Sequence, residues 1–377
     1  MELYVNKNQK LLRCGYTTGT CAAAAAKAAA VLLFSKSVPV AIKVKTPSGV
    51  ELELEVLEPF LGEDFASCAV KKDSGDDPDI TDGVLVYAKV SRSKAAKVEV
   101  DGGKGVGRVT RPGLSCPVGS AAINPVPRAM IEEAVAKVCR KYREPCGIKV
   151  IISIPDGERL AKKTYNPRLG IEGGLSVLGT SGIVEPMSEK ALLGSIELEL
   201  KMAASAGRRY VLISPGNYGE DFSRKALGLN TEYSVKCSNY IGETVDFAAQ
   251  FGFRGLLLVG HAGKLVKLAA GVMNTHSRVA DCRMETLAAH AALFGADRQI
   301  VRSILDCITT DEAFGVLERA GLLRETMESV MKKIEYHLRI RANGMETAAI
   351  LFSNPYGMMA KTENAEKLLD SYREEIT

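Results

Sequence analysis

The first part of the chain alternates apolar and polar residues over short segments, as half-buried strands do. This alternation predicts strands over residues 39–46, 50–57, 66–71, 83–90, 97–101 and 147–154. Helices are expected over residues 21–34, an alanine tract, and over residues 128–143. Together these elements predict an N-terminal domain in which a mixed β-sheet packs with helices.

From about residue 188 the pattern becomes helix and then strand, repeated. It predicts strands over residues 209–214, 255–259 and 345–352 and helices over residues 188–207, 241–251, 265–270, 283–294, 297–305, 311–339 with a break near Gly321, and 363–375. This alternation is typical of a parallel α/β sheet, which binds ligands in loops after the carboxyl ends of its strands. The expected fold class is α+β with two domains. Residues 1–155 form the mixed domain, and residues 156–377 form an α/β domain with a largely parallel sheet and added C-terminal helices.

The stretch GYTTGTCAAAAAKAAA, residues 15–30, has the composition of an export signal, a membrane anchor or an ordinary helix. Lys27 interrupts the apolar run, which is shorter than the roughly 20 residues that span a bilayer. Alanine is the strongest helix former, and Thr17, Thr18 and Thr20 are natural N-cap residues. We expect a capped helix whose free backbone N–H groups face a negative group. A capped, buried helix without a ligand is the alternative.

Composition and charge narrow the range of functions. A net charge of +4, 6% aromatic residues and no Trp argue against broad nucleic-acid binding. Nine cysteines, an odd number with no CxxC pair, predict reduced thiols and a cytoplasmic protein. Four histidines without HExxH or HxH spacing argue against a protein-bound metal. We therefore expect neither a nucleic acid nor a membrane as a partner.

The familiar nucleotide-binding motifs are absent from the sequence. GGKGVG at 102–107 is not GxGxxG, and GHAGKL at 260–265 lacks the loop length and the Ser or Thr of a P-loop. Glycine-rich loops at strand ends instead carry cationic or polar side chains, namely Arg108, Arg111, Arg128, Arg168, Thr180, Ser181, Asn217, His261 and Lys264. Arginine forks match carboxylates, so shared carboxylate binding is one interpretation and solvated surface charge is the other.

Two further features have open interpretations. His261 follows an apolar strand and precedes a helix, where a base, a hydrogen-bond donor and a structural partner are all reasonable roles. The loop KKDSGDDPDIT, residues 71–81, is either a turn with capping carboxylates or a source of carboxylates that hold ribose hydroxyls or take up a proton.

Successive blocks over about three-quarters of the chain resemble the CbiD family, the cobalt-precorrin-5B C(1)-methyltransferases of anaerobic cobalamin biosynthesis. The resemblance is carried by GYTTGTCAAAAAKAA, SGDDPDIT, GKGVGRVTRPGL, INPVPR, NPRLGIEGGLSVLGTSGIVEPMSE, KCSNYIGE and LLLVGHAGKLVKLAAGVMNTHS, which follow one another from residue 15 to about residue 277. Ser74 stands where alanine is expected, and Ala262 stands where a bulkier residue is common. The region after about residue 290 carries less distinctive signal.

The resemblance implies that S-adenosylmethionine donates a methyl group to C-1 of cobalt-precorrin-5B, which gives cobalt-precorrin-6A. The substrate is a tetrapyrrole with acetate and propionate side chains, and the cobalt belongs to this substrate rather than to the protein. A nucleotide-dependent transferase and a non-catalytic corrinoid-binding protein are the alternatives. The oligomeric state is open, with a homodimer as one candidate.

The resemblance and the loops together assign roles to individual residues. The N-terminal domain is expected to bind the substrate and the α/β domain the cofactor, with the macrocycle at their boundary. The substrate-binding candidates are Thr17, Thr18, Thr20, Arg108, Arg111, Arg128, Arg168 and Lys264. The cofactor-binding candidates are Gly179, Thr180, Ser181, Gly182, Glu185, Gly216, Asn217, Asp246 and Gly260, with Glu185 or Asp246 accepting from ribose hydroxyls. The catalytic candidates are His261 and Asp79.

Overall fold

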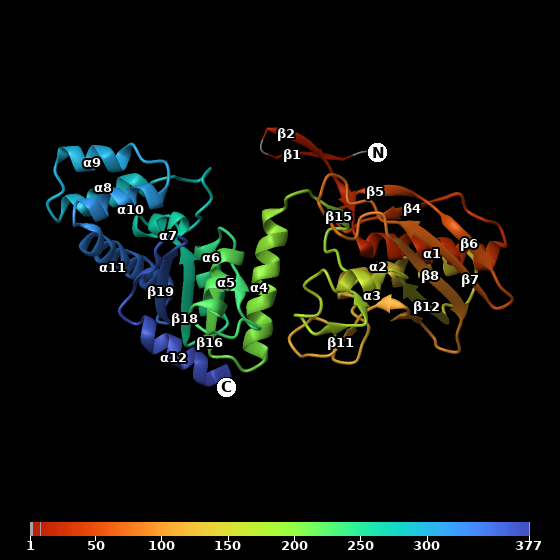
Figure 1. Ribbon diagram of the computed structural model, residues 1–377. Helices are drawn as coiled ribbons and strands as arrows, with labels where there is room; N and C mark the ends of the chain where they lie inside the picture. Colours follow the sequence, from red (N-terminus) through yellow and green to blue (C-terminus); the bar gives the residue numbers. More distant parts are fainter. Residues whose placement is uncertain (1–2, 8, 377) are drawn as a thin grey trace. The chain divides into compact units, whose positions relative to one another are not determined.

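The computed structural model describes residues 3–7 and 9–376, and the chain divides into two compact units, Met1–Glu189 and Lys190–Thr377 (Figure 1). This division comes later in the chain than the predicted boundary between residues 155 and 156. The reason is that three short strands of the glycine-rich segment pair with strands of the first unit. The pairs are β13 (Ile171–Glu172) with β11 (Arg108–Val109), β14 (Gly174–Leu175) with β10 (Gly105–Val106), and β15 (Ile183–Val184) with β3 (Gly15–Tyr16).

A five-stranded sheet forms the centre of the first unit. Its strand order is β6 (Leu57–Leu61), β7 (Phe65–Lys71), β8 (Leu85–Arg92), β12 (Ile148–Ser153) and β9 (Val98–Gly102). Strands β12 and β9 are parallel and the other neighbours are antiparallel, so the predicted mixed sheet is confirmed. Two hairpins and a short helix accompany the sheet: β1 (Tyr4–Lys7) with β2 (Lys10–Arg13), β4 (Ala41–Lys45) with β5 (Glu51–Glu55), and α3 (Gly157–Ala161).

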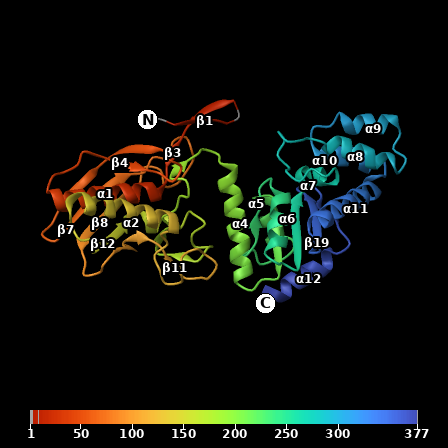
Figure 2. The same ribbon diagram turned by 180° about the vertical axis from the view of Figure 1, so that it is seen from behind.

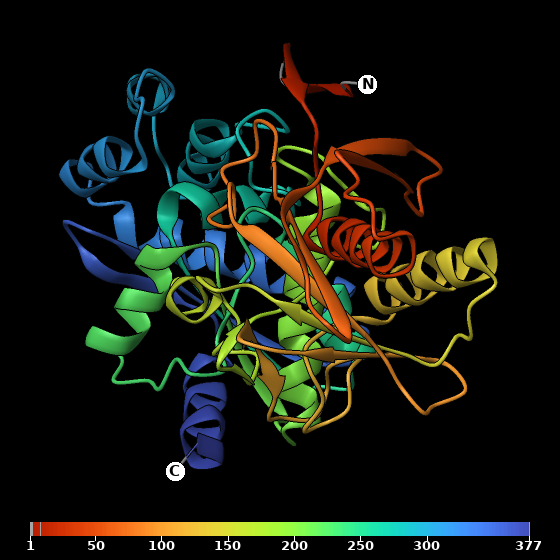
Figure 3. The same ribbon diagram turned by 90° about the vertical axis from the view of Figure 1, so that its right-hand side faces the viewer.

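Two helices, α1 (Thr18–Ser35) and α2 (Pro125–Tyr142), lie side by side against this sheet (Figures 2 and 3). The alanines of α1 are fully buried, and their small side chains let α2, β7 and β8 approach closely. The helix is long and apolar enough to cross a membrane, yet 78% of its apolar window is buried inside the unit. Burial of this extent identifies α1 as a core helix.

The glycine-rich segments of the first unit pack against one another. Gly105, which begins β10, has φ +73°, and a Cβ there would overlap the carbonyl oxygen of Ile154. Only a residue without a Cβ combines this backbone conformation with so close an approach. Close packing of backbone against backbone therefore explains these glycines without a ligand.

The second unit contains a sheet in the order β17 (Val235–Lys236), β16 (Tyr210–Ser214), β18 (Gly255–His261), β19 (Glu346–Ser353) and β20 (Gly357–Lys361). The first four strands are parallel and β20 is antiparallel to β19, which confirms the prediction of a largely parallel sheet. The strands are apolar on both faces, as expected for a sheet that helices cover on both sides.

Helices lie on both sides of this sheet (Figure 1), and alternate residues of its strands pack under different helices. Leu212 and Leu257 join the core under α5 (Asn217–Lys225) and α12 (Ala365–Ile376). Val211 and Leu258 join the core on the other face, under α4 (Glu189–Ser205), α6 (Ile241–Gln250), α7 (Ala262–Ala269) and α11 (Leu323–Arg341). The remaining helices are α8 (Arg283–Ala292), α9 (Arg298–Leu305) and α10 (Thr310–Arg319), and the predicted break near Gly321 separates α10 from α11.

Candidate active site

The strand order of the second unit reverses beside β16. The chain passes from β16 through α5 to β17 on one side, and then through α6 to β18 on the other side. Because α5 and α6 pack on opposite faces of the sheet, the loops after β16 and β18 leave in different directions. In α/β sheets, ligands bind at the carboxyl ends of parallel strands beside such a reversal.

Several predicted site residues lie at this edge of the sheet: Gly216, Asn217, Gly260, His261 and Lys264. Lys264 Nζ donates to the carbonyl oxygens of Pro215 at 2.8 Å and Ser238 at 3.4 Å. These bonds join α7 to the loops after β16 and β17. Burial, together with the nearby Lys267 ammonium, holds the pKa of Lys264 below its usual range.

His261 is the N-cap of α7. Its Nδ1 accepts the backbone N–H of Gly263 at 3.1 Å, so the neutral ring carries its proton on Nε2. The ring also meets Phe352 edge-on, with 5.6 Å between the ring centroids. A ring held in this tautomer donates from Nε2 and has no lone pair there for a proton. The geometry therefore favours a donor or structural role over that of a base.

The start of α5 is open toward solvent. Gly216 has φ +143° and ψ −171°, a conformation essentially restricted to glycine, and a Cβ there would meet no atom within 4 Å. The first turn of α5 has no side-chain cap. Asn217 accepts from Lys236 Nζ at 2.9 Å, and Lys236 also pairs with Glu220 at 2.6 Å. Glu220 thus neutralises the Lys236 charge, and the open backbone and the helix start are the features here that suit a small carboxylate.

The other cofactor candidates lie away from this edge. Asp246 on α6 receives two bonds from the Arg341 guanidinium, at 2.8 and 2.6 Å, so its oxygens are engaged within the protein. Residues Gly179, Thr180, Ser181, Gly182 and Glu185 belong to the first unit, which corrects their expected position in the α/β domain. There the loop pairs with β3, and its Gly182 carbonyl accepts the N–H of Thr17 at 3.1 Å.

The start of α1 differs from the free helix start that the sequence suggested. Thr17 Oγ1 accepts the N–H of Thr20, and Thr20 Oγ1 donates to the Gly182 carbonyl at 2.7 Å. Thr17, Thr18 and Thr20 are at most 6% exposed. These polar groups hold the 179–185 loop against the helix, so the structure supports the capped, buried alternative.

The acidic loop uses its carboxylates in the same internal way. Asp79 pairs at 2.7 Å with Lys72, whose side chain is 1% exposed and also bonds to Ser74. Burial raises the pKa of Asp79, but the hydrogen bonds from Lys72 and Thr81 outweigh it and the pKa lies below its usual range. Such a carboxylate is a poor proton acceptor, so the structure favours the capping interpretation over catalysis by Asp79. Neighbouring carboxylates are also bonded: Asp73 to Arg13, Asp76 to the Arg13 N–H, Asp77 to the Met187 N–H and Asp82 to the Ser74 N–H.

The four predicted arginines all belong to the first unit. Arg108 pairs with Asp101 at 2.8 Å. Arg128 donates at 2.6 Å to the carbonyl oxygen of Val100, the residue before Asp101. Arg111 lies along the loop that contains Arg168, because its side chain would touch a Cβ added at Gly170. Arg108 and Arg128 thus both lie near Asp101, Arg111 lies beside the loop that contains Arg168, and Lys264 belongs to the second unit.

Sequence reasoning missed two buried lysines, Lys72 and Lys267. They are 2% and 3% exposed, and each has its ammonium group fixed by internal acceptors. The available signal was weak, since Lys267 stands inside the apolar run Leu265-Val-Lys-Leu-Ala-Ala270 and Lys72 follows a strand. Burial of either residue becomes evident only in the fold.

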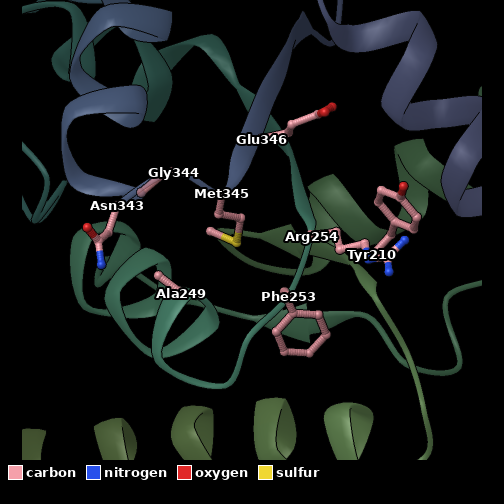
Figure 4. A pocket seen from close by; sticks show the side chains of 9 residues that line it. Tyr210, Ala249, Phe253, Arg254, Asn343, Gly344, Met345 and Glu346 are labelled. Atoms are coloured by element: carbon pink, nitrogen blue, oxygen red, sulfur yellow. The ribbon is translucent and has the colours of Figure 1, made fainter.

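The second unit also has a hollow of about 520 Å³ at the opposite, amino ends of its strands. Phe253, Arg254 and Met345 surround it, together with Tyr210 and Glu346 (Figure 4). None of the predicted site residues lines it. Since α/β sheets bind ligands at the carboxyl ends of their strands, this hollow is the weaker candidate.

The fold and this edge define a two-unit α+β protein with a candidate ligand site at the switch point of a parallel sheet. Two family models match the chain, CbiD over residues 5–186 and CbiD, C-terminal domain, over residues 274–363. The chain belongs to the CbiD family, which confirms the resemblance inferred from the sequence blocks. The first match ends close to the boundary between the two units.

Curated relatives extend over nearly the whole chain. A protein of Ruminiclostridium cellulolyticum is 51% identical over 91% of this chain and 89% of its own length. A protein of Alkaliphilus metalliredigens is 43% identical over 100% of this chain and 99% of its own length. Both are named cobalt-precorrin-5B C(1)-methyltransferase. A crystal structure of cobalamin biosynthesis protein (cbiD) from Archaeoglobus fulgidus has 31% identity, covers 74% of this chain and 86% of its own, and has a TM-score of 0.41.

Replacing Asp79 with asparagine tests the buried ion pair. The change leaves the Lys72 ammonium without its counter-charge, so the free energy of unfolding at pH 7 should fall by roughly 2–4 kcal/mol. The folded pKa values of Asp73 and Asp79 lie below the unfolded value of about 3.9. Their stabilisation is therefore present above about pH 4 and is lost as the pH falls further. The measurement is urea unfolding of both proteins between pH 3 and pH 7, and the difference between them should shrink toward the acid end.

The matched control is Asp82→Asn, because Asp82 accepts the backbone N–H of Ser74 and, within residues 3–7 and 9–376, pairs with no lysine or arginine. Asparagine retains an acceptor for this N–H. The free energy of unfolding of Asp82→Asn should fall by less than about 1 kcal/mol. Equal falls in the free energy of unfolding of the two variants would show that the Lys72–Asp79 ion pair stabilises the fold no more than the Asp82 hydrogen bond does.

Proposed function

We propose that this chain transfers a methyl group from S-adenosylmethionine to C-1 of cobalt-precorrin-5B and forms cobalt-precorrin-6A, in anaerobic cobalamin biosynthesis. The observation that carries the proposal is 43–51% identity to proteins of this name over 91–100% of the chain. Against a nucleotide-dependent transferase, the sequence lacks the GxGxxG and P-loop motifs of such enzymes. A non-catalytic corrinoid carrier would bind the macrocycle without methyl transfer.

We assign the amino-acid end of the methyl donor to the edge beside β16 and β18. Support comes from the open backbone at Gly216, the uncapped start of α5 and the Lys264 ammonium, which are donors that match a carboxylate. The ribose requires an acceptor other than Asp246, since Arg341 already binds that carboxylate.

When bound, S-adenosylmethionine supplies a methyl group whose bond to sulfur breaks as its bond to C-1 forms, and the sulfur leaves as a neutral thioether. No side chain therefore has to protonate the leaving group. The contribution of this chain is to bind carboxylates, orient the reacting atoms and exclude water. Orientation of this kind is worth up to about 7–11 kcal/mol.

The direct test incubates the protein with methyl-labelled S-adenosylmethionine and cobalt-precorrin-5B. We expect the label in the macrocycle and one S-adenosylhomocysteine per methyl transferred, measured by mass spectrometry. Stabilisation by ATP but not by S-adenosylhomocysteine would favour the nucleotide-dependent class. Binding of the macrocycle without transfer of label would favour a carrier.

His261→Asn separates the two roles of the histidine. Asparagine keeps an acceptor for the Gly263 N–H and loses the Nε2 donor, so melting temperature should be unchanged. The rate constant kcat should fall by no more than about 100-fold, below the larger losses that removal of a general base can cause. His261→Ala, which also removes the cap, should cost about 1 kcal/mol of stability in addition. Complete loss of turnover in a folded Asn variant would contradict the donor role.

Gly216→Ala tests the assignment of the donor site. A methyl group there enters the open space that we assign to the donor, so the Kd of S-adenosylhomocysteine should rise by roughly 10-fold or more. Gly252→Ala is the control for an alanine at a positive φ (+77°) with no atom within 4 Å of an added Cβ. Because the Gly216 conformation is more strained for alanine, the melting temperature of Gly216→Ala is measured beside its Kd to separate strain from lost donor space. Calorimetric titration of both variants measures the effect, and an unchanged Kd in Gly216→Ala would remove the donor from this edge.

A further inference from the structure

Helix α7 carries two lysines one turn apart, Lys264 and Lys267, on the same helix face. Lys267 is 3% exposed, and its Nζ donates to the carbonyl oxygens of Thr275 at 3.2 Å and Ala280 at 2.9 Å. Among the described residues, neither ammonium has an ion-pair partner. The Asp281 carboxylate, which pairs with Arg283, also interacts electrostatically with Lys267. A buried charge is costly unless it is matched in this way, so the Lys267 ammonium is held in one position by these groups.

The Lys267 ammonium fixes the two ends of one loop, residues 275–280. The N–H of Thr275 also donates to the carbonyl of Asn239 at 2.9 Å. Asn239 follows Ser238, whose carbonyl receives the Lys264 ammonium. The 275–280 loop is therefore attached to the same edge of the sheet as the loops after β16 and β18.

The tip of this loop presents hydrogen-bond donors to solvent. His276 Nδ1 accepts the backbone N–H of Arg278 at 3.1 Å, which leaves Nε2–H as a donor without a partner in the described part of the chain. The guanidinium of Arg278 is exposed and has no partner among the residues that the structure describes. Guanidinium and imidazole N–H groups so close in sequence match the oxygens of a carboxylate.

Exposed apolar side chains accompany these donors. Val279 is 60% exposed and Ile308 is 78% exposed. Arg283 connects their segments, because it pairs with Asp281 at 2.7 Å and donates to the Ile308 carbonyl at 3.5 Å. A cation beside exposed apolar surface suits a ligand with an apolar ring and carboxylates at its rim.

We propose that the 275–280 loop binds a peripheral carboxylate of the tetrapyrrole substrate through Arg278 and His276, and that Lys267 is the residue that positions this loop. The proposal rests on the proposed function, which supplies the ligand. The exposed loop tip suits a broad ring that extends out of the edge, whereas the open backbone at Gly216 suits the compact methyl donor.

The test uses cobyrinic acid, whose acetate and propionate arms are free carboxylates, and cobinamide, in which these arms are amides. Arg278→Ala should raise the Kd of cobyrinic acid by roughly 5- to 20-fold and leave the Kd values of cobinamide and S-adenosylhomocysteine unchanged. Arg298→Ala, which removes an exposed arginine of α9, is the matched control and should change none of the three. Titration monitored by the corrin absorbance measures the corrinoid affinities, and calorimetry measures S-adenosylhomocysteine.

Lys267→Met tests positioning, because it removes the ammonium and keeps the length of the side chain. It should raise the Kd of cobyrinic acid by a factor similar to that of Arg278→Ala. The double variant should bind cobyrinic acid no more weakly than either single variant. Independent losses that multiply in the double variant would overturn the positioning role. If Lys267→Met does not fold, Arg278→Ala alone still decides the carboxylate contact.

Unchanged cobyrinic acid binding in Arg278→Ala, or a loss confined to S-adenosylhomocysteine, would overturn the carboxylate site. The labelled-methyl assay on the unmodified protein tests the proposed function separately. If the unmodified protein transfers no methyl group but Arg278→Ala weakens cobyrinic acid binding, the carboxylate site is supported and the proposed activity is contradicted.

Discussion

The hydrogen bond from Lys264 to the Pro215 carbonyl is the contact on which the candidate site depends. The strand order reverses beside β16, so the loops after β16 and β18 start from neighbouring strands and leave in different directions. Without a link between them these loops would be independent. A half-buried ammonium that binds the carbonyl after β16 from the helix after β18 fixes their separation, at the edge where α/β sheets bind ligands.

Helix α7 extends this arrangement to the surrounding loops. Its N-cap His261 is fixed by Gly263, and Lys267 binds the 275–280 loop from the same helix. Leu265, Val266 and Leu268 of this helix are fully buried, so the polar contacts start from a rigid support. The positions of His261, Lys264 and the 275–280 loop thus depend on the packing of one short helix, because loops held by a rigid element keep their geometry more precisely than free loops.

Strong periodicity made most of the fold predictable, including the parallel strands and the break at Gly321. The elements that were missed are β1, β2, β3, β6, β10, β11, β13, β14, β15, β17, β20, α3 and α5. All of them except α5 have five residues or fewer, which is too short for a clear periodic pattern. Strand β17 has only two residues, and α5 begins with the polar sequence Asn217-Tyr-Gly219, whose Asn217 is held by Lys236. The domain boundary was misplaced for a related reason. A glycine-rich composition is typical of a linker, but here glycine permits close backbone pairing, as at Gly105.

For the site, the sequence predicted that the loops after the parallel strands lie at one edge of the sheet. It did not predict which polar side chains bind other parts of the chain and which are available to a ligand. A threonine hydroxyl, an aspartate carboxylate or a helix N–H binds a ligand or another part of the chain with the same chemistry, so sequence cannot distinguish the two cases. In the first unit, the Thr20 hydroxyl and the Asp79 carboxylate are paired internally. At the edge of the second unit, Gly216 and the exposed Arg278 still have open space or free donors among the described residues. A ligand completes hydrogen bonding where the protein has left it incomplete, and this difference favours the second unit as the place where carboxylates of the reactants bind.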